Sequence, residues 1–134
     1  MWGLGALAIL AAVNVVMFLS HYAGRLTFPW DFIGGYHAHA YGWYADGSVF
    51  EPPQWFPWSD LGFPAYWSLQ SGAFYLPLAL LDAVGQPYTI AAATWLQSLH
   101  VLVGSLGMYV LLRTLRFEPA VAILGALAFH FSST

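Results

Sequence analysis

The sequence predicts an all-α polytopic membrane fold, with about three transmembrane helices and juxtamembrane helices in a long first external loop. Composition is the first observation. Of the 134 residues, 60% are hydrophobic and only 7% are charged, whereas soluble domains carry about 25% charged residues. The second observation is a set of apolar runs with helical lengths close to a bilayer thickness. The third is charge placement, because no Lys or Arg occurs between Leu26 and Leu112.

The charge and the cysteine count exclude several classes of protein. A net charge of -3 leaves no basic surface to hold the phosphates of a nucleic acid, so no nucleic-acid partner is expected. The chain contains no Cys, which excludes a disulfide framework, a thiolate nucleophile and a Cys-ligated zinc site. The partner that the composition predicts is the lipid bilayer.

Residues 1–20 are predicted to form the first span. Trp2 to Leu19 is an uncharged run that would be roughly 27 Å long as a helix, close to one hydrocarbon thickness. A cleaved signal peptide is the alternative. No basic residue precedes the run, and the following residues, Ser20 to Ala23, lack the small-x-small cleavage pattern. These two features favour a membrane anchor.

Residues 21–87 are predicted to form an external loop. Five of the six acidic residues lie in this loop, namely Asp31, Asp46, Glu51, Asp60 and Asp82. The basic residues Arg113 and Arg116 follow the next long apolar run. Because basic loops stay on the cytoplasmic side, the turn at Arg113 is expected inside and residues 26–87 are expected to be extracytoplasmic.

Two short helices are expected within this loop. Residues 31–45 are predicted to lie along the membrane surface, with Phe32, Tyr36 and Trp43 on one face. Residues 73–84 are apolar but would be only about 18 Å long as a helix, and Pro77 lies in the middle of this segment. We therefore expect a juxtamembrane or re-entrant helix there that does not cross the bilayer.

Two further spans follow the loop. Residues 88–112 are predicted to form the second span, in which Gly104, Ser105 and Gly107 offer small side chains for close helix packing. Glu118 and Pro119 open a third span over residues 119–134, which is short for a bilayer. We expect the natural protein to continue beyond Thr134, so that residues 1–134 form the amino-terminal part of a larger transmembrane domain.

The order of these segments resembles that of a known family. The features that carry the likeness are the segments "FPWDFIGGYH" with Asp31 soon after the first span, "FPWSDLGFPAYWSLQSGAFYLPL" with Asp60 before an apolar helix, "LHVLVGSLGMYVLLRTL" and "AVAILGALAFHFSS". In this order and spacing they resemble the amino-terminal part of the GT-C membrane glycosyltransferases, most closely the YfhO-like branch. The resemblance covers nearly the whole chain.

This resemblance implies transfer of a sugar from a polyprenyl-phosphate or polyprenyl-diphosphate donor to an acceptor on the external face. It also implies that an acidic residue in the first external loop acts as a general base or helps to hold a divalent metal such as Mg²⁺ or Mn²⁺. Asp31 is the matching position. A carboxylate suits the role because the acceptor hydroxyl loses its proton as it attacks the anomeric carbon. The alternative for Asp31 is a helix N-cap.

Asp60 is the second catalytic candidate, although Ser59 and Asp60 before Leu61 and Gly62 are also typical of a turn. Arg25 is the only cation predicted outside. Its guanidinium suits the donor phosphate, and an interfacial snorkelling residue is the alternative.

Several polar residues have both a functional and a structural interpretation. His37 and His39 would share a face on an extended strand and could then line a polar site or bind a metal, whereas on a helix they would point apart. A surface or hydrogen-bonding role is favoured for this pair. Gln97, Ser98 and His100 lie within the second span and are expected to make interhelical hydrogen bonds rather than to line a lipid groove. The sequence suggests no partner for His130.

The sequence therefore predicts a membrane glycosyltransferase that acts by direct displacement with inversion and whose remaining acidic motif lies beyond Thr134. The alternative is a non-enzymatic membrane component, either a transporter segment or an assembly subunit. A duplicated inverted unit downstream would favour a transporter.

Overall fold

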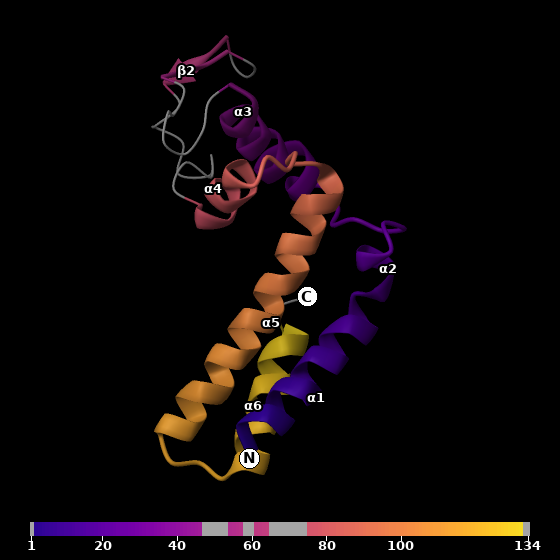
Figure 1. The fold of residues 1–134 in the computed structure, drawn as a ribbon, viewed down its shortest axis with the longest axis vertical. Coiled ribbons are helices and arrows are strands. Elements are labelled where there is room, and N and C mark those ends of the chain that lie inside the picture. The colour runs from indigo at the N-terminus through magenta and orange to yellow at the C-terminus, as the bar shows by residue number, and fades with distance from the viewer. Residues whose placement is uncertain (1, 47–53, 58–60, 65–74, 133–134) are drawn as a thin grey trace. The chain divides into compact units, whose positions relative to one another are not determined.

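The computed structural model describes residues 2–46, 54–57, 61–64 and 75–132 (Figure 1). This part of the chain is helical apart from one pair of two-residue strands. In order, its elements are α1 (Trp2–Met17), α2 (Leu19–Tyr22), the π-helix η1 (Phe32–His37), α3 (Ala38–Asp46), β1 (Trp55–Phe56), β2 (Phe63–Pro64), α4 (Leu76–Ala83), α5 (Ile90–Thr114) and α6 (Pro119–Ser132). The chain divides into a helical unit, residues 1–26 with 94–134, and a loop unit, residues 27–93. The predicted all-α class is confirmed.

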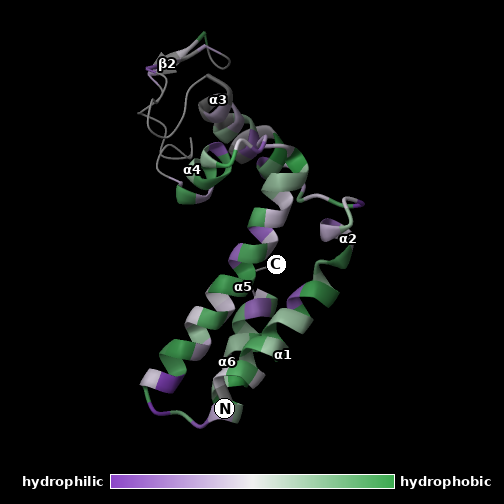
Figure 2. Cartoon of the chain, viewed as in Figure 1, coloured by the Kyte–Doolittle hydropathy of each residue, from purple (hydrophilic) through white to green (hydrophobic). Residues whose placement is uncertain are grey.

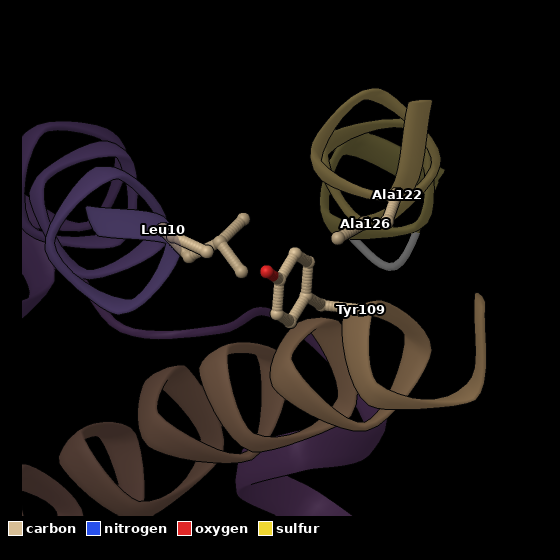
Figure 3. Close-up of a cluster of buried hydrophobic side chains, with 5 residues drawn as sticks. Leu10, Tyr109, Ala122 and Ala126 are labelled. Carbon is tan, nitrogen blue, oxygen red and sulfur yellow. The ribbon is translucent and has the colours of Figure 1, made fainter. Parts of the chain in front are cut away.

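The core of the helical unit lies where α1, α5 and α6 meet. Leu10 of α1 is fully buried and Tyr109 of α5 is nearly so. They pack with Ala122 and Ala126 of α6 (Figure 3). The two alanines let the backbone of α6 approach its neighbours closely, which is the usual basis of helix packing in membranes.

Small residues also mark the contact between α5 and α6. A Cβ atom added to Gly104 would lie 2.8 Å from Cε1 of Phe129, and one added to Gly125 would lie 2.4 Å from Cδ1 of Leu112. The small-residue face predicted for the second span is therefore confirmed at Gly104. It is wrong at Gly107, where an added Cβ would meet nothing within 4 Å.

A buried polar network joins α1, α2 and α5. Asn14, which is 1% exposed, donates from Nδ2 to the backbone oxygen of Ser98 at 2.9 Å. Tyr22 donates from its hydroxyl to Oδ1 of Asn14 at 2.6 Å, and Trp95 donates from Nε1 to the backbone oxygen of Tyr22 at 3.1 Å. The Ser98 hydroxyl instead donates to Thr94 within its own helix. The predicted interhelical bond at Ser98 thus uses the backbone rather than the side chain.

We expect Asn14→Ala to lower the free energy of unfolding of the helical unit by between about 0.6 and 2 kcal/mol, the range for interhelical hydrogen bonds in membranes. The change removes the donor to Ser98 and the acceptor for Tyr22 together. Equilibrium unfolding in mixed detergent micelles measures it. Val16→Ala is the matched control, because Val16 lies on the same helix and is 76% exposed. Equal stabilities of the two variants would contradict the structural role of Asn14.

The helical unit buries several polar residues beside its apolar core and exposes large apolar side chains. Its buried polar residues are Asn14, Thr94, Ser98, Ser105 and His130. Large apolar side chains such as Leu4, Val103 and Leu124 are 65–78% exposed, and Figure 2 shows hydrophobic colour along α1, α5 and α6. Within the described residues, α5 is the one helix long and apolar enough to cross a membrane. The predicted first and third spans are apolar helices of 16 and 14 residues.

Local sequence explains where several helices begin and end. The Thr89 hydroxyl accepts a hydrogen bond from the backbone N–H of Ala92 at 3.1 Å, which caps α5. Gly24 and Gly85 follow α2 and α4 in the left-handed conformation, with φ of 69° and 64°. Arg116 takes the same position after α5 at φ 66°, and the Phe117 N–H bonds the oxygen of Leu112 at 3.0 Å. This pattern is the Schellman ending of a helix.

The loop unit contains the two helices expected in the external loop. Residues 31–45 are helical as predicted, within η1 and α3. The segment 73–84 forms α4, which is eight residues long, while residues 73 and 74 lie outside the described part. Pro77 occupies the first turn of α4, where the missing N–H has no helical partner in any case.

Candidate functional site

The candidate site is built around the start of the helix η1–α3 in the loop unit. Trp30 precedes the helix at φ 51°, a left-handed conformation that costs a non-glycine residue about 1–3 kcal/mol. Directly after Asp31 the chain forms the π-helix η1. π-helices are rare and occur frequently at functional sites. Asp31 is therefore flanked on both sides by backbone geometry that most chains avoid.

The side chain of Asp31 is exposed and does not cap the helix. Asp31 occupies the N-cap position, but its φ of -58° and ψ of -27° are already helical and its carboxylate makes no capping hydrogen bond. An N-cap normally has an extended backbone that directs its side-chain oxygen at the free N–H groups. The N-cap prediction is thus correct for the position and wrong for the interaction. The carboxylate is left available for another role.

His37, at the end of η1, lies in an aromatic stack. Its ring is stacked on Tyr88 with a centroid distance of 5.3 Å and on Tyr41 with a distance of 6.0 Å. Tyr88 is 7% exposed and lies just before α5 in the sequence. Nearby, the Tyr44 hydroxyl donates to the backbone oxygen of Gln86. These contacts fix the helix that carries Asp31 against the segment 86–88.

Burial controls the protonation of this aromatic cluster. It raises the pKa of Tyr75 to about 12, with a smaller contribution from Tyr88. It also raises the pKa of Tyr88, and it raises that of Tyr44 together with the charge of Asp82. These phenols therefore stay protonated near neutral pH, and that of Tyr44 serves as a hydrogen-bond donor. Burial lowers the pKa of His37, while a hydrogen bond to the Tyr88 backbone opposes the shift.

We expect His37 to titrate below its ordinary pKa of 6.5, because burial disfavours the imidazolium. A lowered folded-state pKa means that the unfolded chain binds more protons in this window. The stability contributed by neutral His37 is therefore complete above pH 6.5 and is lost as the pH falls through the folded-state pKa. NMR titration of the imidazole carbons measures the value, with His37→Gln to assign the signal.

In the same titration, Tyr88→Ala should move the pKa of His37 up toward 6.5 by re-exposing the imidazole. Tyr41→Ala is the matched control and should move it less, because Tyr41 is already 52% exposed. A wild-type pKa above 6.5 would contradict the expected burial effect.

The predicted metal role of the His37 and His39 pair is not supported by the backbone. Both residues lie in helices. The extended strand on which they would share one face is therefore not formed here. No group of three His, Cys, Asp or Glu residues suited to a metal ion occurs within the described ranges. The described residues therefore do not build a complete site for Mg²⁺ or Mn²⁺.

Two of the other predicted site residues, Arg25 and Asp60, are not tested by the structure. Arg25 belongs to the helical unit, where it follows Gly24 with an exposed side chain, and its N–H donates to the oxygen of Ser20 at 2.9 Å. Asp60 lies outside the described residues. The turn predicted around Asp60 is supported at the next two positions, because Leu61 and Gly62 have φ of 67° and 92°. The roles of Arg25 and Asp60 stay predictions.

Sequence analysis missed the partner of His130. This residue is fully buried, and its Nδ1 lies 2.9 Å from the hydroxyl of Ser105 on α5. Nε2 of His130 is buried and has no hydrogen-bond partner among the residues that the structure describes. The available signal was the small-residue face of α5, since Ser105 was already placed on it. Gln97 and His100 are exposed, and Nδ1 of His100 lies 2.6 Å from the backbone oxygen of Leu96 in the same helix. The interhelical role of these two side chains stays a prediction.

No family model, curated protein or solved structure matches this chain. Function is therefore inferred from the residues and their geometry.

Proposed function

We propose that this chain is the amino-terminal part of a GT-C-type membrane glycosyltransferase of the YfhO-like branch. It transfers a sugar from a polyprenyl-phosphate-linked donor to an extracytoplasmic acceptor. The observation that carries the proposal is the setting of Asp31, whose exposed carboxylate makes no cap and is flanked by the left-handed Trp30 and the π-helix η1. Unusual backbone geometry around an exposed carboxylate supports a catalytic role.

The helical unit supports integration into a membrane. Its exposed apolar side chains and buried polar side chains suit a lipid environment, in which polar groups face the bundle. α5 has 25 residues, ample for one crossing. α1 and α2 are separated only at Phe18, and the Phe18 N–H still bonds the oxygen of Asn14 at 2.9 Å. Together they form a helical stretch roughly 30 Å long, which is enough for the first span.

The topology follows from charge and helix length. α4 is eight residues long, about 12 Å, so it does not cross. The chain then crosses twice between its amino terminus and the turn that carries Arg113 and Arg116, through α1–α2 and through α5. Both arginines are exposed and suit the cytoplasmic side. The loop unit, with Asp31, is accordingly extracytoplasmic, and α6 begins the third span.

The chemistry assigned to Asp31 is general base catalysis. The carboxylate takes the proton of the acceptor hydroxyl as the hydroxyl oxygen attacks the anomeric carbon. The bond from that carbon to the donor phosphate breaks, and the lipid phosphate leaves with the bonding electrons. Attack opposite the leaving group inverts the anomeric configuration. The Arg25 guanidinium, exposed at the end of α2, is the candidate to hold the phosphate.

The assay for this function uses the full-length protein in proteoliposomes that contain a radiolabelled sugar on polyprenyl phosphate. The expected result is protein-dependent transfer of label to an external acceptor fraction. The absence of transfer from polyprenyl-phosphate and polyprenyl-diphosphate donors across common sugars would contradict the proposal and favour the non-enzymatic alternative.

A further inference from the structure

Trp30 combines two features that each carry a cost. It is a large aromatic residue at φ 51°, a left-handed backbone conformation that strains a residue other than glycine. Its side chain is also 89% exposed, although an indole gains free energy when it is buried. Neither feature helps the chain to fold. The pair indicates that the ring is presented for contact with something else.

The backbone holds this presentation in place. The oxygen of Trp30 accepts hydrogen bonds from the N–H groups of Ile33 and Gly34, both at 3.0 Å. The oxygen of Pro29 accepts one from the Phe32 N–H at 3.3 Å, and the proline ring restricts the backbone before Trp30. The indole is thus displayed from a fixed turn, immediately before the exposed carboxylate of Asp31.

A sugar ring suits this pairing of groups. A pyranose has a face of C–H groups that packs on an aromatic ring and a rim of hydroxyls that hydrogen-bond to a carboxylate. The tripeptide Phe-Pro-Trp also occurs twice in the sequence, at residues 28–30 before Asp31 and at residues 56–58 before Asp60. An aromatic ring beside an acidic residue is therefore a recurring feature of this loop.

A lipid surface is the competing occupant, because exposed tryptophans often anchor proteins at membrane interfaces. Charge argues against it here. No Lys or Arg lies between residues 26 and 112 to bind lipid phosphates. If the Trp30 ring entered the lipid interface, the neighbouring carboxylate would come close to the lipid phosphates and be repelled by them.

We propose that Trp30 is the platform on which a sugar ring of the acceptor stacks, which makes the acceptor a carbohydrate. The stacked ring carries the hydroxyl that Asp31 deprotonates. This assignment rests on the proposed function for its catalytic meaning, whereas the binding of the sugar to Trp30 is testable without transfer.

The test uses the full-length protein in nanodiscs and methyl glycosides of glucose, galactose and mannose as probes. Saturation-transfer NMR measures their binding. Trp30→Gly removes the ring while tolerating the left-handed backbone, and Trp30→Phe keeps an aromatic face. Trp55→Ala is the matched control, since Trp55 is a second exposed tryptophan in the loop unit, 53% exposed. We expect Trp30→Gly to weaken binding about tenfold or more, in line with aromatic stacking energies of ~1–3 kcal/mol, and Trp30→Phe to retain most of it.

Four outcomes would overturn the proposal. In the first three, the wild type binds no glycoside, Trp30→Gly binds glycosides as tightly as the wild type does, or Trp55→Ala loses as much binding as Trp30→Gly does. In the fourth outcome, Trp30→Gly loses association of the loop with lipid but keeps glycoside binding, which would assign Trp30 to the bilayer.

The same measurements separate this proposal from the proposed function. If glycosides bind through Trp30 but no donor supports transfer, the proposed function fails while the sugar platform stands. Where transfer occurs, Trp30→Gly should raise the KM for the acceptor and leave that for the donor unchanged.

Discussion

Asp31→Asn should reduce sugar transfer by the full-length protein about 10²- to 10⁴-fold, the typical effect of removing a general base. Asparagine has nearly the same shape as aspartate but does not accept a proton at neutral pH. The Asp31 side chain is exposed and makes no capping bond, so stability should change by less than about 0.5 kcal/mol. Transfer of labelled sugar in proteoliposomes, at equal protein level, measures the effect.

Asp46→Asn is the control for this experiment, because Asp46 is an acidic residue at the other end of the same helical segment. Its transfer rate should stay near that of the wild type. Near-normal transfer by Asp31→Asn, combined with loss of transfer in Asp60→Asn, would show that Asp60 is the catalytic carboxylate.

The second large effect concerns the side of the membrane on which each unit lies. Gln54 and Thr114 are both exposed, and the chain contains no native Cys. A membrane-impermeant thiol reagent added to intact cells should label Gln54→Cys and leave Thr114→Cys unlabelled until the membrane is opened. The physical reason is that Arg113 and Arg116 hold the end of α5 on the cytoplasmic side.

The reversed pattern, with Thr114→Cys labelled and Gln54→Cys protected, would place Asp31 in the cytoplasm. Labelling of both positions in intact cells would show that α5 does not cross. In either case the external transfer reaction would lose its basis, whatever the activity of the Asp31 variants.

Local signals in the sequence determined most of the helical segments. The apolar run after Tyr88 predicts α5, Pro119 marks the first turn of α6, and Gly24 and Gly85 follow helices in the left-handed conformation. These features depend on residues within one or two turns of each other, so they are visible in the sequence. Pro77 lies in the middle of the predicted segment 73–84 but in the first turn of α4, because this helix begins only at Leu76.

The candidate site was only partly accessible in this way. Asp31 was found from its place after the first span and its match to a family pattern. The left-handed Trp30 and the π-helix that follows have no such signal. Trp is not a residue that favours positive φ.

Contacts between distant residues were decided by tertiary structure alone. Asn14 and Ser98 are 84 positions apart, and Ser105 and His130 are 25 apart. Which polar atoms meet depends on how each helix is rotated about its axis, and a uniformly apolar helix carries little information about that rotation. The sequence by itself determined that the chain forms apolar helices with an acidic, aromatic loop between them. Packing decided which polar groups are buried, that Tyr88 stacks on His37, and that the exposed carboxylate of Asp31 makes no capping hydrogen bond.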